Sequence, residues 1–396
     1  MSRATEQKSV LLAMGPHYID RMHRGIAQYA GQNGWHLTNL FGNTPELIQQ
    51  RECDGIIAVL SSNDPLSDAV IQRKKPTVNL SITRHRLKMP HLTGDNEQMG
   101  RSAAQHFLGR GFQRFLWFSE NSSPAAQLRL RGYRSELESN GFECATLIVS
   151  EAFQSSPPNW RTLRTWIQET LQKRGFPCAV YAFKDSQAVN LLDACIACGF
   201  RVPEEVAVLG TDNHPLICPT AAVPLSSINH DLEEFGRRAA AELDLIMRGA
   251  PSKNRIIEIP HQGITVRQST NVFAINDTHV VKALHFINNH FQNPINVADI
   301  VKATGLSRRA LERRFQEHLK LSILGKLNQH RLDHICRLLR ESAMPIADIA
   351  AQSGFNTPEY LHRVFQKQIG TTPRKYRLSK KSEFASPEHD NNERPD

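Results

Sequence analysis

Two stretches of the chain repeat one pattern: VADIVKATGLSRRALERRFQEHL over residues 297–319 and IADIAAQSGFNTPEYLHRVFQKQI over residues 346–369. Each contains Ala-Asp-Ile at its start, then a glycine followed by an apolar residue, then Leu-x-Arg-x-Phe. A glycine after an amphipathic run is typical of the end of a helix, where the backbone often needs a positive φ. We therefore predict, in each stretch, a helix, a turn at Gly305 or Gly354, and a second helix.

The second helix of each copy has a clear start and a clear inner face. Ser307 and Thr357 stand where a side-chain oxygen can accept the free amides of a helix, although the second turn is longer by one residue. The Leu and Phe of Leu-x-Arg-x-Phe are four residues apart and therefore face inward together. The outer face keeps polar and arginine side chains, which can bond base edges and phosphates in the DNA major groove. The residues expected to contact DNA are Ser307, Arg308, Arg309, Glu312, Arg313 and Arg314 in the first copy, and Thr357, Glu359, His362 and Arg363 in the second.

The alternative is a pair of helical hairpins whose charges only solvate the surface. Two copies disfavour it, as does the amphipathic helix that joins them, with Leu324, Leu327, Ile335, Leu338 and Leu339. From about Asp277 to Ser379 the chain resembles the DNA-binding domain of the AraC/XylS family, through Gly354-Phe355, Tyr360, Arg363, Phe365, Lys367, Gly370, Pro373 and Tyr376-Arg377. The resemblance implies an all-α C-terminal domain with two helix-turn-helix units that binds a double-stranded DNA operator.

Basic residues are concentrated in the same region. Between Asp277 and Lys381 the chain has 18 Lys and Arg against 8 Asp and Glu, whereas residues 1–276 have 29 against 26. A local positive patch is what phosphate neutralisation and counterion release require. A basic membrane-binding face would instead take the form of one amphipathic helix.

The chain is long enough for two or three packed domains, with 396 residues of which 40% are hydrophobic. No apolar run approaches the ~18 residues of a membrane span, and the N-terminus lacks the apolar core of a signal peptide, so we expect a cytoplasmic protein. The seven cysteines show no framework of pairs, which fits a reducing compartment. Cys195 and Cys198 form the one C-x2-C, and a structural role is favoured over a redox or metal role because no second pair exists. We expect neither a metal nor a cofactor.

Before residue 271 the chain alternates between short apolar runs and amphipathic segments. The expected strands are Val10–Met14, Gly55–Leu60, Phe115–Phe118, Ala179–Phe183, Val206–Leu209 and Ile256–Pro260. The expected helices include Asp20–Asn33, Glu97–Arg110, Arg131–Asn140, Gln187–Cys198 and Leu232–Arg248. Such alternation is typical of parallel sheets flanked by helices. We predict an α/β fold with two of these sheets, which form two hinged lobes.

Polar side chains follow several of the expected strands. They are His17, Tyr18 and Asp20 after the first strand, Asp185 after Ala179–Phe183, and Asp212 with Asn213 after Val206–Leu209. In an open α/β sheet, the carboxyl ends of the strands face the ligand crevice. Carboxylates and amides bond sugar hydroxyls, and aromatic rings stack on sugar C–H surfaces. We therefore expect a sugar between the lobes, although each residue taken alone also suits a helix cap or a loop.

From about Ser9 to Val266 the chain resembles the sensor domain of the LacI/GalR family, which has the periplasmic-binding-protein fold. The matching segments are Gly94-Asp95-Asn96 with Gly100, Arg129-Leu130-Arg131-Gly132-Tyr133, Lys184-Asp185 with Ala188, residues 202–213 (VPEEVAVLGTDN), and residues 225–228 (LSSI) followed by Gly236. The resemblance implies that Asp95, Arg129 and Asp185 hold the effector, and that the sensor forms a homodimer.

The order of domains departs from that family, which carries its DNA-binding domain ahead of the sensor. Here we expect a sensor at residues 1–270, a linker at 271–276, the DNA-binding domain at 277–379, and a disordered polar tail at 380–396. This arrangement is similar to that of regulators of pentose (xylose-like) operons.

We therefore expect a transcription regulator that responds to a monosaccharide. Most relatives with this DNA-binding domain activate transcription, so an activator that works with RNA polymerase is favoured. An enzyme acting on a sugar or nucleoside is the first alternative, with Asp185 and Asp212 as the available carboxylates, but no nucleotide or nucleophile motif supports it. In the second alternative, the sensor binds a protein partner instead of a small molecule.

Overall fold

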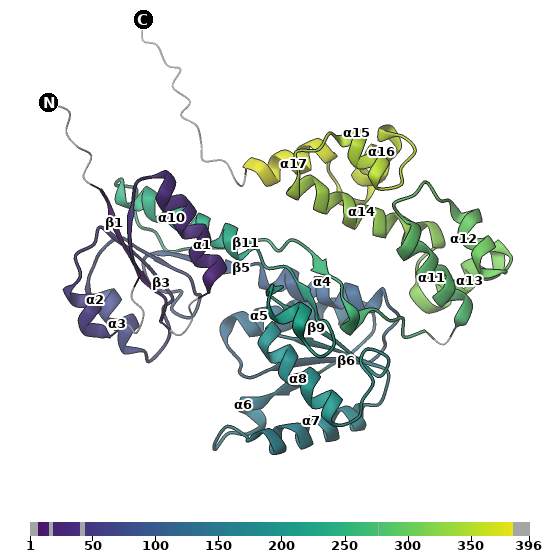
Figure 1. Ribbon diagram of the computed structural model, residues 1–396, viewed down its shortest axis with the longest axis horizontal. Helices are drawn as coiled ribbons and strands as arrows, with labels where there is room; N and C mark the ends of the chain where they lie inside the picture. Colours follow the sequence, from purple (N-terminus) through teal and green to yellow (C-terminus); the bar gives the residue numbers. More distant parts are fainter. Residues whose placement is uncertain (1–6, 16–18, 40–43, 276, 383–396) are drawn as a thin grey trace, which may run out of the picture. The chain divides into compact units, whose positions relative to one another are not determined.

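The computed structural model describes residues 7–15, 19–39, 44–275 and 277–382 (Figure 1). The chain divides into two compact units. The N-terminal unit comprises Met1–Phe107 and Gln113–Val272, and the C-terminal unit comprises Leu108–Phe112 and Phe273–Asp396. Among the described residues, no helix combines the length and the apolar character that a bilayer span requires.

The first sheet of the N-terminal unit is parallel in all of its described pairings. Its strands, in spatial order, are β11 (Arg255–Ile259), β5 (Pro90–Gly94), β4 (Thr77–Asn79), β3 (Gly55–Ala58), β1 (Ser9–Ala13) and β2 (His36–Asn39). Helices α1 (Asp20–Gln32) and α10 (Leu232–Met247) cover one face, and α2 (Pro45–Gln50) and α3 (Pro65–Gln72) cover the other. Successive residues of β1 point to opposite faces, so Leu12 packs with α1 and α10 while Leu11 packs with α2 and α3.

The second sheet has the strand order β12 (Ile264–Thr265), β10 (Ser226–Ile228), β9 (Val206–Thr211), β8 (Cys178–Ala182), β6 (Phe115–Ser119) and β7 (Cys144–Ile148). Its helices are α4 (Asn96–Leu108), α5 (Pro124–Ser139), α7 (Trp160–Arg174) and α8 (Asp185–Ala197), with the short helices α6 (Val149–Ala152) and α9 (Ile217–Thr220). Leu116 and Phe118 face α7 and α8, whereas Trp117 faces away from them and meets Tyr181 edge to face.

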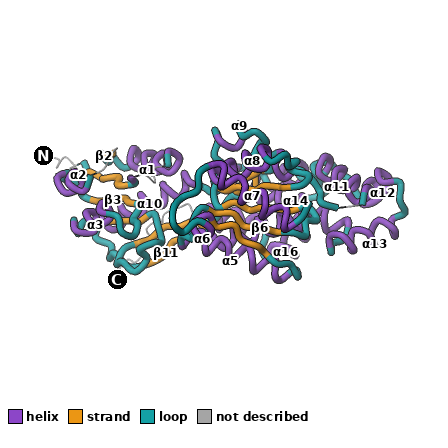
Figure 2. The backbone as a smooth tube through the Cα atoms, turned by 90° about the horizontal axis from the view of Figure 1, so that it is seen from below, coloured by secondary structure: helices purple, strands orange, loops and turns teal. Residues whose placement is uncertain are grey.

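The predicted α/β fold with two parallel sheets flanked by helices is confirmed, and Figure 2 shows the helices on either side of the strands. One pairing differs from the prediction, because β12 runs antiparallel to β10. The chain passes between the two sheets from β5 to β6, from β10 to β11, and from β11 to β12. Each lobe is therefore built from separate parts of the sequence.

The described part of the C-terminal unit is helical. Its helices are α11 (Thr278–His290), α12 (Val297–Thr304), α13 (Arg308–Leu319), α14 (Ile323–Glu341), α15 (Ile346–Gln352), α16 (Pro358–Ile369) and α17 (Pro373–Ser382). The turns after α12 and α15 contain Gly305 and Gly354, both at φ 73°, as the repeat predicts. Ser307 and Thr357 cap the following helices by accepting amides. We call α11–α13 the first half of this unit and α15–α17 the second half; α14 joins them.

The boundaries between the units differ from those expected. The predicted linker includes Phe273 and Ile275, but both pack into the core of the C-terminal unit. Ser269 and Thr270 are buried in the N-terminal unit, where Ser269 Oγ donates to the Val208 carbonyl. At the other end, α17 continues past residue 379 to Ser382. The rest of the predicted tail, residues 383–396, lies outside the described residues, as does residue 276 of the predicted linker.

Candidate ligand site and nucleic-acid interface

Two glycines bring α4 and α5 into close contact at the second sheet. A Cβ on Gly100 would collide with the backbone of α5, and a Cβ on Gly132 would collide with the Glu97 carbonyl of α4. Because neither residue has a Cβ, the start of α4 can lie against α5. Asn96, the first residue of α4, consequently reaches Arg129 in α5.

Arg129 is 4% exposed, and its guanidinium is held on several sides. Its Nη2 donates to Asn96 Oδ1 at 2.8 Å, and its Nε donates to the same oxygen at 3.2 Å. Its Nη1 donates to the Phe183 carbonyl, and the guanidinium carbon lies 4.7 Å from the centroid of the Phe183 ring. A buried cation needs such partners, because desolvation otherwise destabilises it. Its hydrogen-bond partners are neutral, and the nearby carboxylate of Asp212 interacts with its positive charge.

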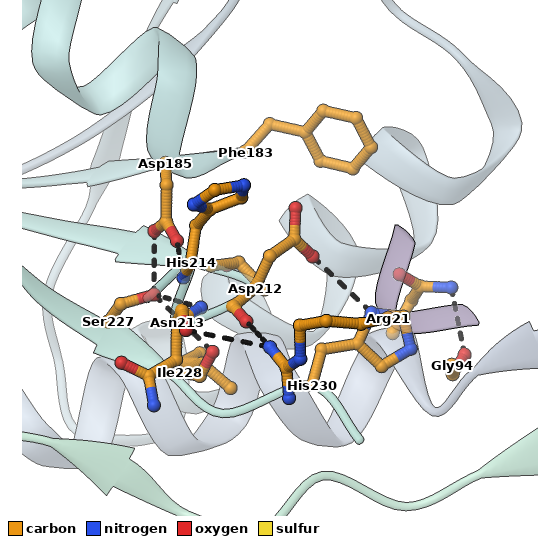
Figure 3. Close-up of polar contacts among 12 residues, drawn as sticks. Arg21, Gly94, Phe183, Asp185, Asp212, Asn213, His214, Ser227, Ile228 and His230 are labelled. Carbon is orange, nitrogen blue, oxygen red and sulfur yellow. Dashed lines mark hydrogen bonds and ion pairs between the residues drawn. The ribbon is translucent and has the colours of Figure 1, made fainter. Parts of the chain in front are cut away.

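Asp185, the first residue of α8, is fully buried. Ser227 Oγ donates to its Oδ1 at 2.6 Å, and the His214 amide donates to its Oδ2 at 2.8 Å (Figure 3). The Cys218 thiol donates to Oδ2 at 3.1 Å. Burial, followed by the nearby charge of Asp212, raises the pKa of Asp185 to about 7, while these donors act in the opposite direction.

Asp212 follows β9 in a backbone conformation with φ 106°, and Asn213 follows with φ 47°. Such conformations are uncommon for residues other than glycine and are found most often at functional sites. The turn directs the Asp212 carbonyl toward α1, where Arg21 Nη1 donates to it at 2.7 Å (Figure 3). This hydrogen bond joins a helix of the first sheet to a strand end of the second.

His230 follows β10 and pairs with Asp212, with 3.4 Å between His230 Nδ1 and Asp212 Oδ1. Burial opposes the ionisation of Asp212, but the hydrogen bond and charge of His230 and the charges of Arg129 and Lys184 together lower the pKa of Asp212. The two carboxyl groups thus differ in environment: the pKa of Asp185 is raised and that of Asp212 is lowered.

Two buried polar atoms beside this cluster have no hydrogen-bond partner within the described chain. They are His230 Nε2 and Asn229 Oδ1. His230 is 8% exposed, and Gly94 leaves space beside its Nε2 because a Cβ there would come within 2.7 Å. Buried polar atoms in native proteins nearly always have a partner, so these two are candidates for contact with a bound molecule.

The structure brings four of the predicted ligand residues together at the second sheet: Arg129, Asp185, Asp212 and Asn213. Asn213 is tied to this group because its amide donates to Ser227 Oγ at 3.0 Å. Two others take different positions. Asp20 is exposed and lies 4.0 Å from Arg24, and Asp95 accepts the Gln98 amide as a cap of α4. His17 and Tyr18 lie outside the described residues.

Sequence reasoning missed four residues of this cluster, namely Arg21, Asn96, Ser227 and His230. A signal was present for three of them, because Asn96, Ser227 and His230 also lie at or near the carboxyl ends of strands. No local pattern distinguishes Arg21 from Arg24, the other arginine of α1.

We call α13 and α16, the second helices of the two repeats, the recognition helices, because their outer faces are predicted to contact DNA. The first of them, α13, exposes three arginines: Arg308, Arg309 and Arg313. Arg313 is 70% exposed and forms a loose ion pair with Glu317 at 3.7 Å. An ion pair this exposed contributes little to stability, so the side chain can exchange its partner for a base or a phosphate.

The second recognition helix, α16, exposes Glu359 and Arg363, whereas His362 is half-buried. The guanidinium carbon of Arg363 lies 5.2 Å from the centroid of the Tyr360 ring. Such stacking holds the guanidinium in position without using its hydrogen-bond donors. Arg313 and Arg363 occupy equivalent positions of the repeat, as the alignment of Leu-x-Arg-x-Phe predicts.

Two residues expected on the outer face of α13 are engaged within the protein. Arg314 is half-buried, and its Nη1 donates to Asp277 at 2.5 Å. The Glu312 carboxylate accepts the Ile323 amide at the start of α14. The structure corrects the expectation that these two side chains are directed outward. Asp277 and the N-terminus of α14 lie beside α13 and form hydrogen bonds with Arg314 and Glu312, respectively.

Cys195 lies in the apolar core of the second sheet, whereas Cys198 is half-buried. Cys195 is fully buried, and burial raises the pKa of its thiol well above the usual range. A neutral thiol is a poor nucleophile and metal ligand. Across the described residues, no group of three His, Cys, Asp or Glu side chains is placed to hold a metal ion.

The chain is similar to known proteins in both units. Residues 104–270 match the periplasmic binding protein-like domain, and residues 300–379 match a helix-turn-helix domain. The xylose operon regulatory protein of Haemophilus influenzae is 27% identical, over 95% of this chain and 100% of that protein. The protein of the same name from Escherichia coli (strain K12) is 25% identical, over 91% of this chain and 94% of the relative.

A solved structure shows the same fold over nearly the whole length. It is that of the xylose-binding transcription activator xylR, with 24% identity and a TM-score of 0.58, covering 95% of this chain and 99% of that chain. The names of these relatives are those of regulators of transcription. The chain therefore resembles XylR-type transcription regulators over most of its length: residues that match a periplasmic binding protein-like domain precede residues that match a helix-turn-helix domain.

Proposed function

We propose that this regulator activates a sugar catabolic operon and that its effector is a pentose of the xylose class. The observation that carries the proposal is the group of polar side chains around the buried Arg129 of α5, the buried Asp185 after β8 and the half-buried Asp212 after β9. The names of the relatives support the choice of sugar, since they are xylose operon regulators and one is described as binding xylose.

The sugar site uses donors and acceptors of complementary kinds. Asp212 and Asp185 accept bonds from sugar hydroxyls, while Arg129 donates to hydroxyl oxygens. His230 Nε2 and Asn229 Oδ1 supply two further polar atoms that lack partners within the described chain. A pentose, which is a small polyol, matches a group of this composition better than a long apolar ligand does.

Binding would draw the two lobes together. Arg21 of α1 already reaches the Asp212 carbonyl, so a sugar that bonds Asp212 adds to an existing link between the sheets. A ligand shifts a conformational equilibrium only through its differential affinity for the two states. Here the closed state would gain the contacts from both lobes.

The DNA-binding unit would place α13 and α16 in adjacent major grooves of an operator. Arg313 and Arg363 are the side chains assigned to base edges, with Arg308 and Arg309 on phosphates. The regulator would act in the cytoplasm as a homodimer that contacts RNA polymerase.

Calorimetry with a panel of monosaccharides tests the choice of effector. The panel contains D-xylose, L-arabinose, D-ribose, D-glucose and D-galactose, each titrated into the full chain. The proposal predicts heat of binding with D-xylose or another pentose and no turnover of the sugar. Binding of hexoses alone would overturn the pentose assignment, turnover would support the enzyme alternative, and no response to any sugar would favour a protein partner.

A further inference from the structure

Helix α14 carries two separate hydrophobic cores of the C-terminal unit. Ile323 and Leu327, in its N-terminal part, pack into the core of the first half. Leu332, Ile335 and Leu339, in its C-terminal part, pack into the core of the second half. The apolar side chains thus fix each half to α14 without forming one continuous core, so direct contacts between the halves also affect how they are oriented.

Arg331 lies between these two groups and touches both halves. It is 4% exposed. Its Nε donates to the Phe291 carbonyl at 3.0 Å, and its Nη2 donates to the carbonyls of Asn293 and Ile295 at 2.8 and 3.0 Å. These carbonyls belong to the segment that joins α11 to α12 in the first half. The guanidinium carbon lies 5.5 Å from the centroid of Phe355, in the turn of the second half.

The two halves also approach each other directly at this point. Gly354 stands at φ 73°, and a Cβ there would collide with the carbonyls of Phe291 and Asn293 and come within 2.8 Å of Arg331 Nη2. A cavity of about 380 Å³ opens beside the contact, lined by residues of both halves and of α14. Beside this space, the hydrogen bonds of Arg331 and the close approach of Gly354 connect the two halves.

We propose that Arg331 is a positioning residue that sets the spacing and orientation of recognition helices α13 and α16, and thereby the distance between their DNA contacts. The inference rests on the proposed function, in which both helices enter the same duplex. A fork of guanidinium donors binds several carbonyls in fixed directions, which a lysine ammonium does not do.

The geometry of DNA explains why such a residue matters. Adjacent major grooves on one face of a duplex are about 34 Å apart. Helix α14 has 19 residues and is therefore about 28 Å long, close to the separation required. One added base pair rotates the second groove by about 35° and moves it by about 3.4 Å. A rigid unit tolerates that change poorly, whereas a hinged unit adapts to it.

The test measures how strongly binding depends on spacing. The probe is a duplex selected from a randomised pool by binding to the full chain, with its two contacts mapped by hydroxyl-radical footprinting. One and two base pairs are then inserted between the contacts. The full chain is compared with R331M, which removes the donors and keeps the apolar stem, and with R331K, which keeps the charge.

Arg377→Met is the matched control. Arg377 Nη2 donates to the Met344 carbonyl at 2.5 Å, a contact that joins α17 to the segment before α15 within the second half. This variant also removes an arginine-to-carbonyl bond and should also lower the melting temperature. It leaves the connection between the halves intact, so its dependence on spacing should equal that of the wild type.

Two inserted base pairs should weaken wild-type binding about tenfold or more, because one recognition helix loses its base contact. The same insertion should weaken R331M by about threefold or less, with R331K between the two, while R331M binds the uninserted duplex more weakly because the halves must be ordered on binding. Thermal unfolding first shows which variants are folded, and R331K decides the outcome if R331M is not.

A folded Arg331 variant with the full wild-type dependence on spacing would overturn the inference. A wild-type chain that selects no duplex from the pool, or that shows a single short contact, would instead overturn the proposed two-helix mode of DNA binding. The two failures are therefore distinguishable.

Discussion

The two units of this regulator use charge in opposite ways. In the sensor, Arg129 is 4% exposed and Asp185 is fully buried, and both are held by hydrogen bonds within the protein. In the DNA-binding unit, the side chain of Arg313 is 70% exposed, and Arg308 and Arg309 are exposed beside it. A buried, preorganised network suits discrimination between small polyols, because an unmatched group there is costly. Solvated arginines suit a polyanion whose counterions are released on binding.

The two recognition helices also differ in how many arginines they expose. Helix α13 exposes three arginines, while α16 exposes one, and that one stacks on Tyr360. We infer that α13 contributes more of the phosphate attraction and that α16 depends more on a preorganised contact.

The largest effect is expected from Arg129→Met, which tests whether the buried network is the sugar site. The variant removes the donors to Asn96 and Phe183 and to any bound hydroxyl, and truncating a buried charged partner costs about 2–5 kcal/mol. The thermal shift caused by sugar should disappear, while DNA affinity without sugar stays nearly unchanged. Asp185→Ala should likewise abolish the thermal shift caused by sugar and leave DNA affinity nearly unchanged.

Arg131→Met is the control on the same helix. Its side chain is 65% exposed and pairs with Glu97 at the surface, so its removal should leave the sugar response intact. Unchanged sugar affinity in both the Arg129 and the Asp185 variants would move the site elsewhere in the sensor.

Arg313→Ala and Arg363→Ala test whether the exposed arginines of the DNA-binding unit contact base edges. If each arginine bonds a base edge, each loss should cost about 1–3 kcal/mol and relax the preference at one base pair. Affinities for a set of operators with single substitutions give the result directly. A uniform loss over all sequences, with a shallower dependence on salt, would assign these residues to phosphates.

Coupling between the units should be of about 1–3 kcal/mol, which is usual for a switch of this type. Linkage requires that operator DNA raise sugar affinity by the same factor by which sugar raises DNA affinity. Sugar is titrated with and without operator to measure it. Equal affinities in the two titrations would mean that the units act independently.

An isolated C-terminal fragment provides a second test of coupling between the units. It should begin at Phe273 instead of Asp277, because Phe273 and Ile275 belong to the helical core. It would still lack Leu108–Phe112, which also belong to the C-terminal unit. We expect such a fragment to bind DNA more weakly than the full chain and to ignore sugar.

The smallest effect concerns pH. The pKa of Asp185 is raised to about 7 by burial and by Asp212, so the free sensor carries a proton there below that pH and loses it above. Sugar hydroxyls donate to the ionised carboxylate, so sugar affinity should rise about tenfold, or ~1.4 kcal/mol, between pH 6 and 8. Calorimetry at several pH values measures this change, and Asp185→Asn should remove it. An affinity that falls as pH rises would contradict the assigned role.

The raised pKa of Asp185 also affects the free energy of unfolding, which falls with rising pH while sugar affinity increases. Because the folded pKa lies above that of an unfolded aspartate, the contribution of this group to the free energy of unfolding is full in acid and is lost as pH rises through about 7. Ionisation of Asp185 is therefore expected to strengthen sugar binding while it lowers the stability of the free sensor.

The helix-turn-helix units could be predicted almost residue by residue, because their signals are local. The caps at Ser307 and Thr357 and the positive φ of Gly305 and Gly354 depend on a few neighbouring residues. The grouping of Asp185, Asp212 and Asn213 at the candidate ligand site could also be predicted, since strand ends meet at one edge of a parallel sheet. Asp95 and Asp20 show the limit of that rule, because each also suits the start of a helix and takes that position.

The sequence by itself thus determined the order of the domains, the α/β and helical folds, the repeated DNA-binding pattern and its basic charge. Only the tertiary structure decided which charged side chains are already engaged. Arg314 bonds Asp277 across 37 residues and Arg129 bonds Asn96 across 33, whereas Arg313, next to Arg314, remains exposed. The reason is physical: propensities and caps act over a few residues, but the partner of a charged side chain depends on which distant segments pack beside it.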